Sequence, residues 1–211
     1  MVVPDHLVLA ACDLDAGAIW LENQLGVSLS AGGEHVRMGT HNRLLGLGEG
    51  FYLELIAIDP RVLHPGRPRW FGLDDAEWAD DRPRLIHWVV RSEDIERDAL
   101  ACRHDPGEIL AMERGDFRWR ITVPADGHLP GDGLLPTLIQ WDVPFHPSGR
   151  LPESGCRLMK LEAFHPDPAT LREALAALGL ESRLDLHPAV AGQATELVAY
   201  IRTPRGLVEL D

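Results

Sequence analysis

The chain alternates short apolar runs with polar segments rich in glycine, proline and charged residues, and the order of these runs repeats. "DHLVLAAC" (5–12), "RLIHWVVR" (84–91) and "CRLMKLEAF" (156–164) each have the length and apolar content of a buried strand. Each is followed by a segment with apolar residues near helical spacing and then by three more apolar runs. The pattern therefore predicts β-α-β-β-β three times. The expected helices lie within 13–26, 92–105 and 167–180, and the later strands at 27–31, 40–47, 51–58, 108–114, 116–123, 134–143, 182–188, 194–203 and 205–211.

The three segments also align at their starts and ends. Seven residues separate a polar residue in each first strand from an aspartate, a residue type preferred at helix starts: the pairs are His6 with Asp13, His87 with Asp94, and Lys160 with Asp167. The last strands, "YLELIAI", "TLIQWDV" and "GLVELD", align so that Glu54, Gln140 and Glu209 are equivalent. Such agreement predicts one structural unit present in three copies.

The repeat sets the expected domain limits. The first unit spans 1–60, the second 83–146, and the third, more divergent unit 156–211. Residues 61–82 read as a connection, because this part is rich in Pro, Arg, Trp and Asp and has no clear period.

Polar residues at equivalent positions of apolar strands point to a site. Side chains alternate between the faces of a strand, so the neighbouring Trp88 and Trp141 are expected on the opposite face, under helices. A buried carboxylate needs a partner, and one divalent cation would satisfy several such groups together. Two imidazoles and a carboxylate suit Zn, Fe, Ni, Mn or Co. The expected metal ligands are His6, Glu54, His87 and Gln140.

The composition bears on partners and location. A formal net charge of -13 disfavours nucleic acid and anionic membrane surfaces as partners. No apolar run approaches the roughly 20 residues of a membrane-spanning helix, and no signal-peptide pattern opens the chain, so we expect a cytoplasmic protein. Cys12, Cys102 and Cys156 are far apart and suggest neither a disulfide framework nor a thiolate zinc site.

The ordered set of motifs resembles a known superfamily. "DHLVLAACDLDAGAIWLENQLGV", "GTHNRLLGLGEGFYLELIAIDP", "HWVV" and "LIQWD" are similar to glyoxalase-like-domain proteins of the vicinal-oxygen-chelate superfamily, which includes glyoxalase I, extradiol dioxygenases and bleomycin resistance proteins. The resemblance implies an α+β fold of repeated βαβββ units. Two units would form a curved-sheet cup with helices on the outside, and the third unit would be additional.

The resemblance also implies a function. A single divalent metal on the floor of the cup would chelate neighbouring oxygens of a small oxygenated metabolite and stabilise negative charge on them. Gln140 departs from glyoxalase I, which has a carboxylate there, and an amide cannot act as a general base. We therefore expect a metal-dependent lyase, isomerase or dioxygenase rather than glyoxalase activity. The alternative is a non-catalytic binding protein of the same fold, in which the four residues form a hydrogen-bonded polar floor.

Four further residues are weaker candidates for substrate contact. Thr40 and Asn42 open a strand and suit either substrate contact or strand-edge hydrogen bonds. Arg118 and Arg120 share one face of a strand, where they could bind an anionic substrate or form a solvent-facing ladder. Seven other histidines are expected at the surface: His35, His64, His104, His128, His146, His165 and His187.

The third unit has no set of metal-binding residues of its own. Lys160 takes the place of the histidine, and by analogy with the other units it is expected to pair with Glu209. Because two units complete the cup, the third is left over and its apolar surface needs cover. This predicts a homodimer formed through the third units; the alternative is that the third unit packs on the outside of its own cup.

Overall fold

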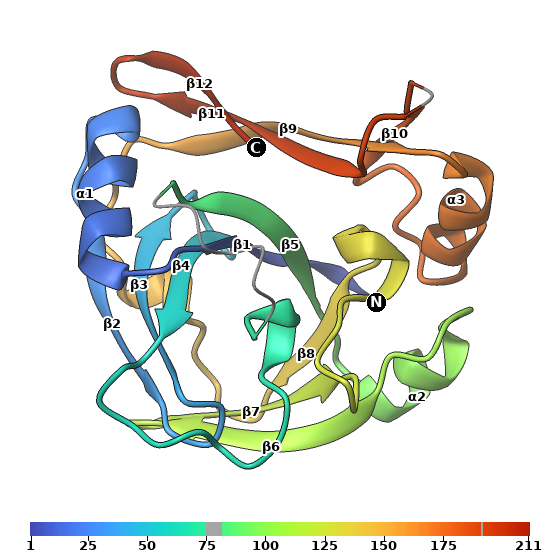
Figure 1. The fold of residues 1–211 in the computed structure, drawn as a ribbon, viewed down its shortest axis with the longest axis horizontal. Coiled ribbons are helices and arrows are strands. Elements are labelled where there is room, and N and C mark those ends of the chain that lie inside the picture. Colours follow the sequence, from blue (N-terminus) through green and yellow to red (C-terminus); the bar gives the residue numbers. More distant parts are fainter. Residues whose placement is uncertain (75–81, 191) are drawn as a thin grey trace.

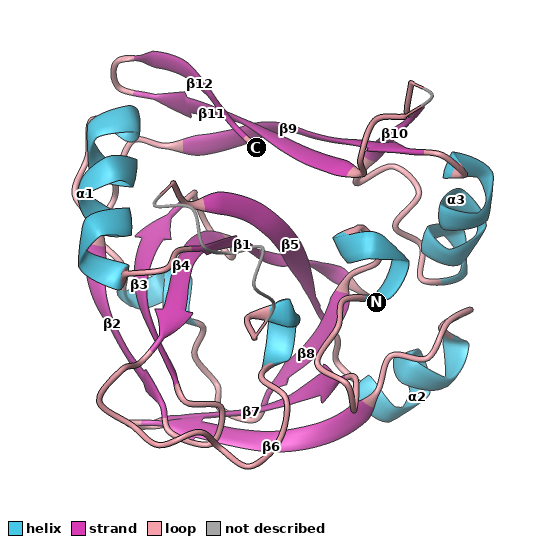
Figure 2. Ribbon diagram, in the orientation of Figure 1, coloured by secondary structure: helices cyan, strands magenta, loops and turns pink. Residues whose placement is uncertain are grey.

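The computed structural model describes residues 1–74, 82–190 and 192–211, and within them it confirms the expected α+β architecture (Figure 2). The residues 75–81 of the expected connection lie outside this part. The first unit comprises β1 (Val3–Ala10), α1 (Leu14–Leu25), β2 (Ser30–His35), β3 (Thr40–Gly46) and β4 (Tyr52–Ile58). The second comprises β5 (Arg84–Arg91), α2 (Ile95–Ala101), β6 (Glu108–Arg114), β7 (Phe117–Val123) and β8 (Thr137–Trp141). The third comprises β9 (Arg157–His165), α3 (Pro168–Ala177), β10 (Asp185–Pro188), β11 (Glu196–Thr203) and β12 (Gly206–Leu210).

Each helix begins directly after the aspartate that the repeat predicted. The carboxylate of Asp13 accepts a hydrogen bond from the third backbone N–H after it, at 2.8 Å, and Asp94 and Asp167 do the same at 3.1 and 3.2 Å. These bonds satisfy backbone donors that have no partner inside the helix. At the other end of α1, Gly26 adopts the left-handed conformation (φ 70°), which a residue without Cβ takes at low cost.

The first two units form one curled eight-stranded sheet, in the order β2-β3-β4-β1-β5-β8-β7-β6 (Figure 1). The first strands β1 and β5 run antiparallel at its centre, and each runs parallel to the last strand of its own unit. The curl brings the two edge strands β2 and β6 together, and Arg37 crosses this seam by donating to the carbonyl of Ala111 at 2.8 Å. α1 contacts β3 and β4, and α2 contacts β7 and β8. The two units thus build the predicted cup.

The third unit has a different strand order. Its separate four-stranded sheet runs β10-β9-β11-β12, so its first and last strands are not neighbours. By analogy with the other units, Lys160 was expected to pair with Glu209. The strand order rules this pair out. Lys160 lies beside Tyr200 of β11, and its ammonium contacts Glu162 of its own strand. Glu209 lies on the far side of Tyr200.

The third unit packs on the outside of its own cup, where its sheet crosses one end of the molecule (Figure 1). Leu161, Ala163 and Ile201 from its sheet share a core with Leu7 and Trp88 from the outer face of the cup. This arrangement covers the apolar surface from which a dimer was inferred, so the homodimer stays a prediction without that support. The limits of the three units also stay predictions. Among the described residues, we found no helix with the length and apolarity needed to cross a membrane.

A second apolar cluster fills the inside of the cup. It includes Val8 and Ile56 from the first unit, and Trp119 and Ile139 from the second. The short helical turn η1 (Trp70–Gly72) also contributes its aromatic side chains to this cluster. The cup is therefore mostly filled, and the few polar side chains inside it stand out.

Candidate functional site

Strand pairing shows which residues of the two units are equivalent. In the antiparallel pair β1–β5, His6 lies opposite Val89, and Val8 lies opposite His87. A pseudo-two-fold rotation that superimposes one unit on the other exchanges these two pairs. His6 and His87 therefore occupy equivalent positions. This part of the sequence alignment holds in the structure.

The alignment of the last strands does not hold. Glu54 lies beside Val8 in the first unit, and the matching place beside Val89 is taken by Thr137, not by Gln140. Gln140 points away from the cup interior, and its Oε1 accepts a hydrogen bond from the backbone N–H of Ile95 at the start of α2, at 2.8 Å. Trp141, expected under a helix, instead lines the cup cavity.

In the first unit a histidine and a carboxylate meet inside the cup. Nε2 of His6 lies 3.6 Å from Oε2 of Glu54, and both side chains are buried. On the other side of the ring, Nδ1 lies 2.7 Å from Oδ1 of Asp5. Because a carboxylate can only accept this bond, Nδ1 carries the proton and Nε2 is directed at Glu54. Tyr52 stacks on the His6 ring at 4.6 Å and fixes its plane.

Asp5 is the buried anion that orients this histidine. Its second oxygen accepts hydrogen bonds from Nε1 of Trp141 at 3.0 Å and from Nε2 of His146 at 2.9 Å. Burial alone would raise the pKa of Asp5, but the hydrogen bonds from His146 and His6 outweigh it, so the pKa lies well below its ordinary value. Asp5 therefore stays ionised and holds His6 in one tautomer.

A second network reaches Glu54 from the other side. Nδ2 of Asn42 donates to Oε1 of Glu54 at 2.5 Å, and Oδ1 of Asn42 accepts from the Arg114 guanidinium at 3.0 Å. The same guanidinium nitrogen donates to Nε2 of His35 at 3.1 Å, so the ring proton of His35 is on Nδ1, beside Thr40 Oγ1 at 3.1 Å. Burial, reinforced by the charge of Arg114, keeps the pKa of His35 well below its ordinary value, and this ring is neutral.

His87 makes a self-contained set of bonds in the second unit. Its Nδ1 donates to the carbonyl of Gly133 at 2.8 Å, while Nε2 accepts from both the backbone N–H and the hydroxyl of Thr137, at 3.1 and 2.9 Å. The ring is fully buried, and burial lowers the pKa of His87 to about 3. Both ring nitrogens are thus occupied by the fold itself.

The four expected ligands do not form a metal site in this arrangement. His6 and Glu54 lie together, but His87 has no free lone pair and Gln140 lies outside the cup. Nowhere in the described parts of the chain do three or more His, Cys, Asp or Glu side chains form a group that could hold a metal ion. Two donors are fewer than the three or four protein ligands of a typical transition-metal site. The expected metal quartet therefore does not fit this structure.

The weaker candidates divide into two pairs. Thr40 and Asn42 belong to the polar network around Glu54. Arg118 pairs with Glu113 at 3.1 Å, and Arg120 pairs with Glu96 and Asp142, all away from the cup. The two arginines therefore form the solvent-facing ladder considered from the sequence.

Sequence reasoning missed several residues of the site. His35 and His146 were expected at the surface, yet His35 is buried in the cup and His146 contacts Asp5. Arg114 was not considered, because it lies 79 residues from His35 and reaches it across the seam of the sheet. The adjacent acid in "DHLVLAAC" was the one local signal, since Asp5 directly precedes His6.

A small cavity lies above Glu54 and His6. Its water-accessible volume is about 20 Å³, enough for about one water molecule. Trp70 and Phe71 from η1 form part of its lining, with Trp119 and Trp141. Phe71 adopts φ 62°, a left-handed backbone conformation that is uncommon for a residue with a side chain.

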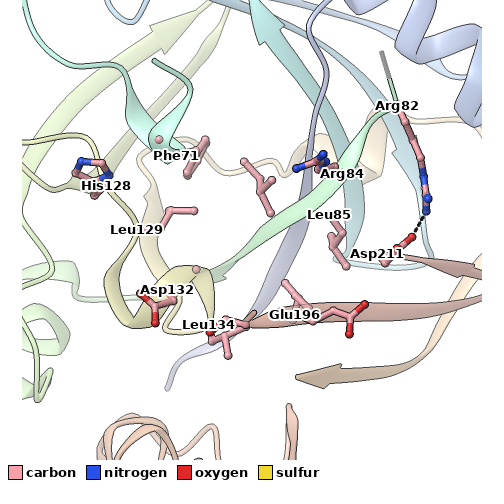
Figure 3. Close-up of a pocket in the computed structure, with 15 residues that line it drawn as sticks. Phe71, Arg82, Arg84, Leu85, His128, Leu129, Asp132, Leu134, Glu196 and Asp211 are labelled. Carbon is pink, nitrogen blue, oxygen red and sulfur yellow. Dashed lines mark hydrogen bonds and ion pairs between the residues drawn. The ribbon is translucent and has the colours of Figure 1, made fainter. Parts of the chain in front are cut away.

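Phe71 also borders a larger hollow of about 770 Å³ between the cup and the third unit (Figure 3). The labelled charged groups there include an ion pair between Arg82 and Asp211. Asp132 lies 3.2 Å from His165. The small cavity is lined by the buried pair of His6 and Glu54, so it is the better candidate for chemistry.

A solved structure agrees with this fold. A hypothetical protein from Staphylococcus aureus superimposes with a TM-score of 0.60 at 15% identity, over 99% of this chain and 84% of that one. Methylmalonyl-CoA epimerase from Mycobacterium tuberculosis gives a TM-score of 0.42 at 20% identity, over 66% of this chain and 86% of that one. No curated protein sequence matches the chain.

The family assignment rests on a separate sequence match. Residues 5–179 match the family described as a glyoxalase-like domain, which covers both units of the cup and the beginning of the third unit. Together with the cup of paired βαβββ units, this match confirms the resemblance drawn from the motifs. The chain belongs to the glyoxalase-like domain family.

Proposed function

We propose that this protein is an enzyme that binds a small oxygenated molecule in the cup and moves a proton at Glu54 and His6. The observation that carries the proposal is the buried row of Asp5, His6 and Glu54, in which the imidazole lies 2.7 Å from one carboxylate and 3.6 Å from the other. A buried carboxylate next to an oriented imidazole is a common arrangement for general acid–base catalysis.

Each residue of the row would have a distinct role. Glu54 lies at the cavity and would accept a proton from carbon next to a substrate carbonyl. Asn42 holds the Glu54 carboxylate in place, and His6 provides a second position for the proton on Nε2. Asp5 orients His6 and stabilises its positive charge when Nε2 is protonated. The cavity has no room for a substrate as it stands, so the turn that carries Trp70 and Phe71 would have to shift.

A divalent metal is the cofactor that the resemblance to the superfamily suggests. Members usually use a divalent cation, which as a Lewis acid would stabilise negative charge on substrate oxygens. The expected quartet is not assembled here, so the proposal assigns the proton transfer to side chains alone.

Deuterium exchange tests the proposal. We would incubate the protein in D₂O with a panel of small aldehydes, ketones and oxo acids, and follow loss of C–H signals next to the carbonyl by proton NMR. The protein would be tested both after chelator treatment and after addition of Zn²⁺, Mn²⁺ or Ni²⁺. We expect exchange in at least one compound with the chelator-treated protein, and a roughly 10²- to 10⁴-fold lower rate in Glu54→Gln.

The matched control is Glu34→Gln, which changes an exposed carboxylate paired with Arg61. This variant should exchange at the wild-type rate. Equal rates in wild type and Glu54→Gln would contradict the assigned role of Glu54. Saturable binding without exchange of any compound would favour the alternative, a non-catalytic binding protein of the same fold.

A further inference from the structure

Arg114 has an unusual position for a charged side chain. It comes from the end of β6 in the second unit, crosses the seam, and ends beside His35 and Asn42 of the first unit. Two glycines make this possible. A Cβ on Gly33 would lie 2.5 Å from Cδ of Arg114, and a Cβ on Gly32 would lie 2.0 Å from Oδ1 of Asn42. Gly33 thus leaves room for Arg114, and Gly32 leaves room for the Asn42 side chain that Arg114 contacts.

The guanidinium is held by neutral groups. Both of its hydrogen bonds use one nitrogen, and both acceptors, Asn42 Oδ1 and His35 Nε2, are uncharged. In the part of the chain that the structure describes, no carboxylate lies within 4 Å of Arg114, and its other N–H groups make no hydrogen bond. A cation of this kind, fixed beside a cavity with donors to spare, suits a carboxylate ligand.

A second donor without an acceptor belongs to a residue that lines the same cavity. Nε1 of Trp70 is buried, and within the described residues it has no hydrogen-bond partner. Trp70 lines the cavity together with Arg114, and its ring lies edge-on to His35 at 5.0 Å, so His35 contacts both the Arg114 guanidinium and the Trp70 ring. Buried donors without partners are costly and uncommon in native proteins, and a bound oxygen would remove that cost.

Arg114 also borders a second pocket, which lies nearer to solvent. It lines the small cavity and, in addition, an outer pocket of about 280 Å³ together with Phe117, Arg150 and Pro147. Arg150 is paired bidentately with Asp116, so Arg114 is the arginine in this pocket whose fork is not taken by a carboxylate. An anion entering from the outer pocket would therefore meet Arg114 before it reached Glu54.

We propose that Arg114 and Trp70 form a carboxylate subsite, held in place by Asn42 and His35, so that the molecule handled at Glu54 and His6 is a small carboxylic acid. This inference rests on the proposed function at the same cavity. It adds that the substrate is anionic, and that the second unit contributes a residue to the site across the seam.

Tryptophan fluorescence provides the test, because Trp70, Trp119 and Trp141 all line the cavity. Wild-type protein would be titrated with pyruvate and benzoate, and with pyruvamide and benzamide as neutral counterparts of similar size. We expect at least one acid to bind saturably and at least tenfold more tightly than its amide. Arg114→Gln should reduce this preference to within about twofold, and Arg114→Lys should leave an intermediate value.

Two further variants separate a ligand role from a structural one. Arg37→Gln removes a hydrogen bond across the same seam but none from the cavity, so it should keep the preference for acids. Trp70→Phe removes the unpartnered N–H and should weaken acid binding severalfold, with the signal of the other two tryptophans retained. The subsite is overturned if neither acid binds, if wild type binds acids and amides equally, or if folded Arg114→Gln keeps the preference.

The outcome is distinguishable from failure of the proposed function. Glu54→Gln should lose deuterium exchange while keeping the preference for acids. Acid binding through Arg114 without any exchange would leave the subsite standing and remove the proton-transfer role. Deuterium exchange of neutral ketones at a rate that Arg114→Gln does not change would remove the carboxylate subsite. The proton-transfer role would then stand.

Discussion

The two halves of the cup contain the same histidine in two different surroundings. His6 and His87 occupy equivalent places on the central strands, but Glu54 faces the first and Thr137 faces the second. At His6, one ring nitrogen is directed at a carboxylate beside a cavity. At His87, both ring nitrogens are engaged by backbone and hydroxyl groups of the fold.

The difference shows that an equivalent position does not imply an equivalent role. Repeated units start with the same backbone, but a single partner decides whether a buried imidazole is available for chemistry. A carboxylate partner leaves charge and a proton position inside the cup. A threonine partner leaves a neutral ring that ties strand β5 to β8 and to the loop at Gly133. The first half of the cup is therefore the proposed place of the chemistry, and the polar contacts of the second half stabilise the fold.

The largest expected effect is on stability, in the second half. His87→Ala leaves a cavity and removes the partner of Gly133 O and of the Thr137 N–H. We expect the free energy of unfolding to fall by about 3–5 kcal/mol. Urea unfolding followed by circular dichroism would measure it. A loss below about 1 kcal/mol would mean that His87 does not hold the fold in the way its bonds indicate.

The pH dependence of the free energy of unfolding also tests the structural role of His87. In the unfolded chain, His87 takes up a proton near its ordinary pKa of 6.5, whereas in the fold its pKa is about 3. Between pH 6.5 and 3 the unfolded state therefore binds more protons, and stability decreases as the pH falls, by up to about 1.4 kcal/mol per pH unit from this one residue. His35, with its lowered pKa, acts in the same direction.

The comparison is between wild type and His87→Asn, each unfolded in urea at several pH values from 7 to 4.5. The difference between their unfolding free energies should shrink as the pH falls below 6, because only the wild type loses the contribution of His87. Parallel curves would show that the ring is not kept neutral by burial.

The smallest effect is expected for the residue that the sequence placed in the metal site. Gln140→Ala removes one hydrogen bond to the start of α2, so the free energy of unfolding should fall by about 1 kcal/mol. Deuterium exchange and metal content should not change, because the side chain lies outside the cup. Loss of activity in a stably folded variant would return Gln140 to the site.

Much of the fold could be predicted from local pattern. The order of strands and helices, the three aspartate caps and the equivalence of His6 and His87 all follow from short-range spacing, which the fold preserves. The register of β8 could not be predicted in this way. Thr137, Leu138 and Ile139 are all buried, and Gln140 and Trp141 are both half-buried, so alternation between buried and exposed positions does not mark the inward face. The consequence was the exchange of Gln140 and Trp141.

The polar network around Glu54 could not be predicted from the sequence, for a different reason. Arg114 meets His35 and Asn42 only because the sheet curls until its edge strands touch. No local pattern encodes that closure. His146 contacts Asp5 across 141 residues from a proline-rich segment, which by itself reads as an exposed linker. These contacts could not be predicted because they depend on how distant parts of the chain come together when the sheet closes. The residue types alone do not show this.

The most direct test of the account compares two substitutions at equivalent places. Glu54→Gln and Thr137→Val each change the partner of a central histidine with little change in side-chain size. With the most active compound from the exchange panel, kcat/KM should fall at least 100-fold in Glu54→Gln and stay within about threefold of wild type in Thr137→Val, with both variants folded by circular dichroism. Similar losses in the two variants, or a greater loss in Thr137→Val, would contradict the division of the cup into a chemical half and a structural half.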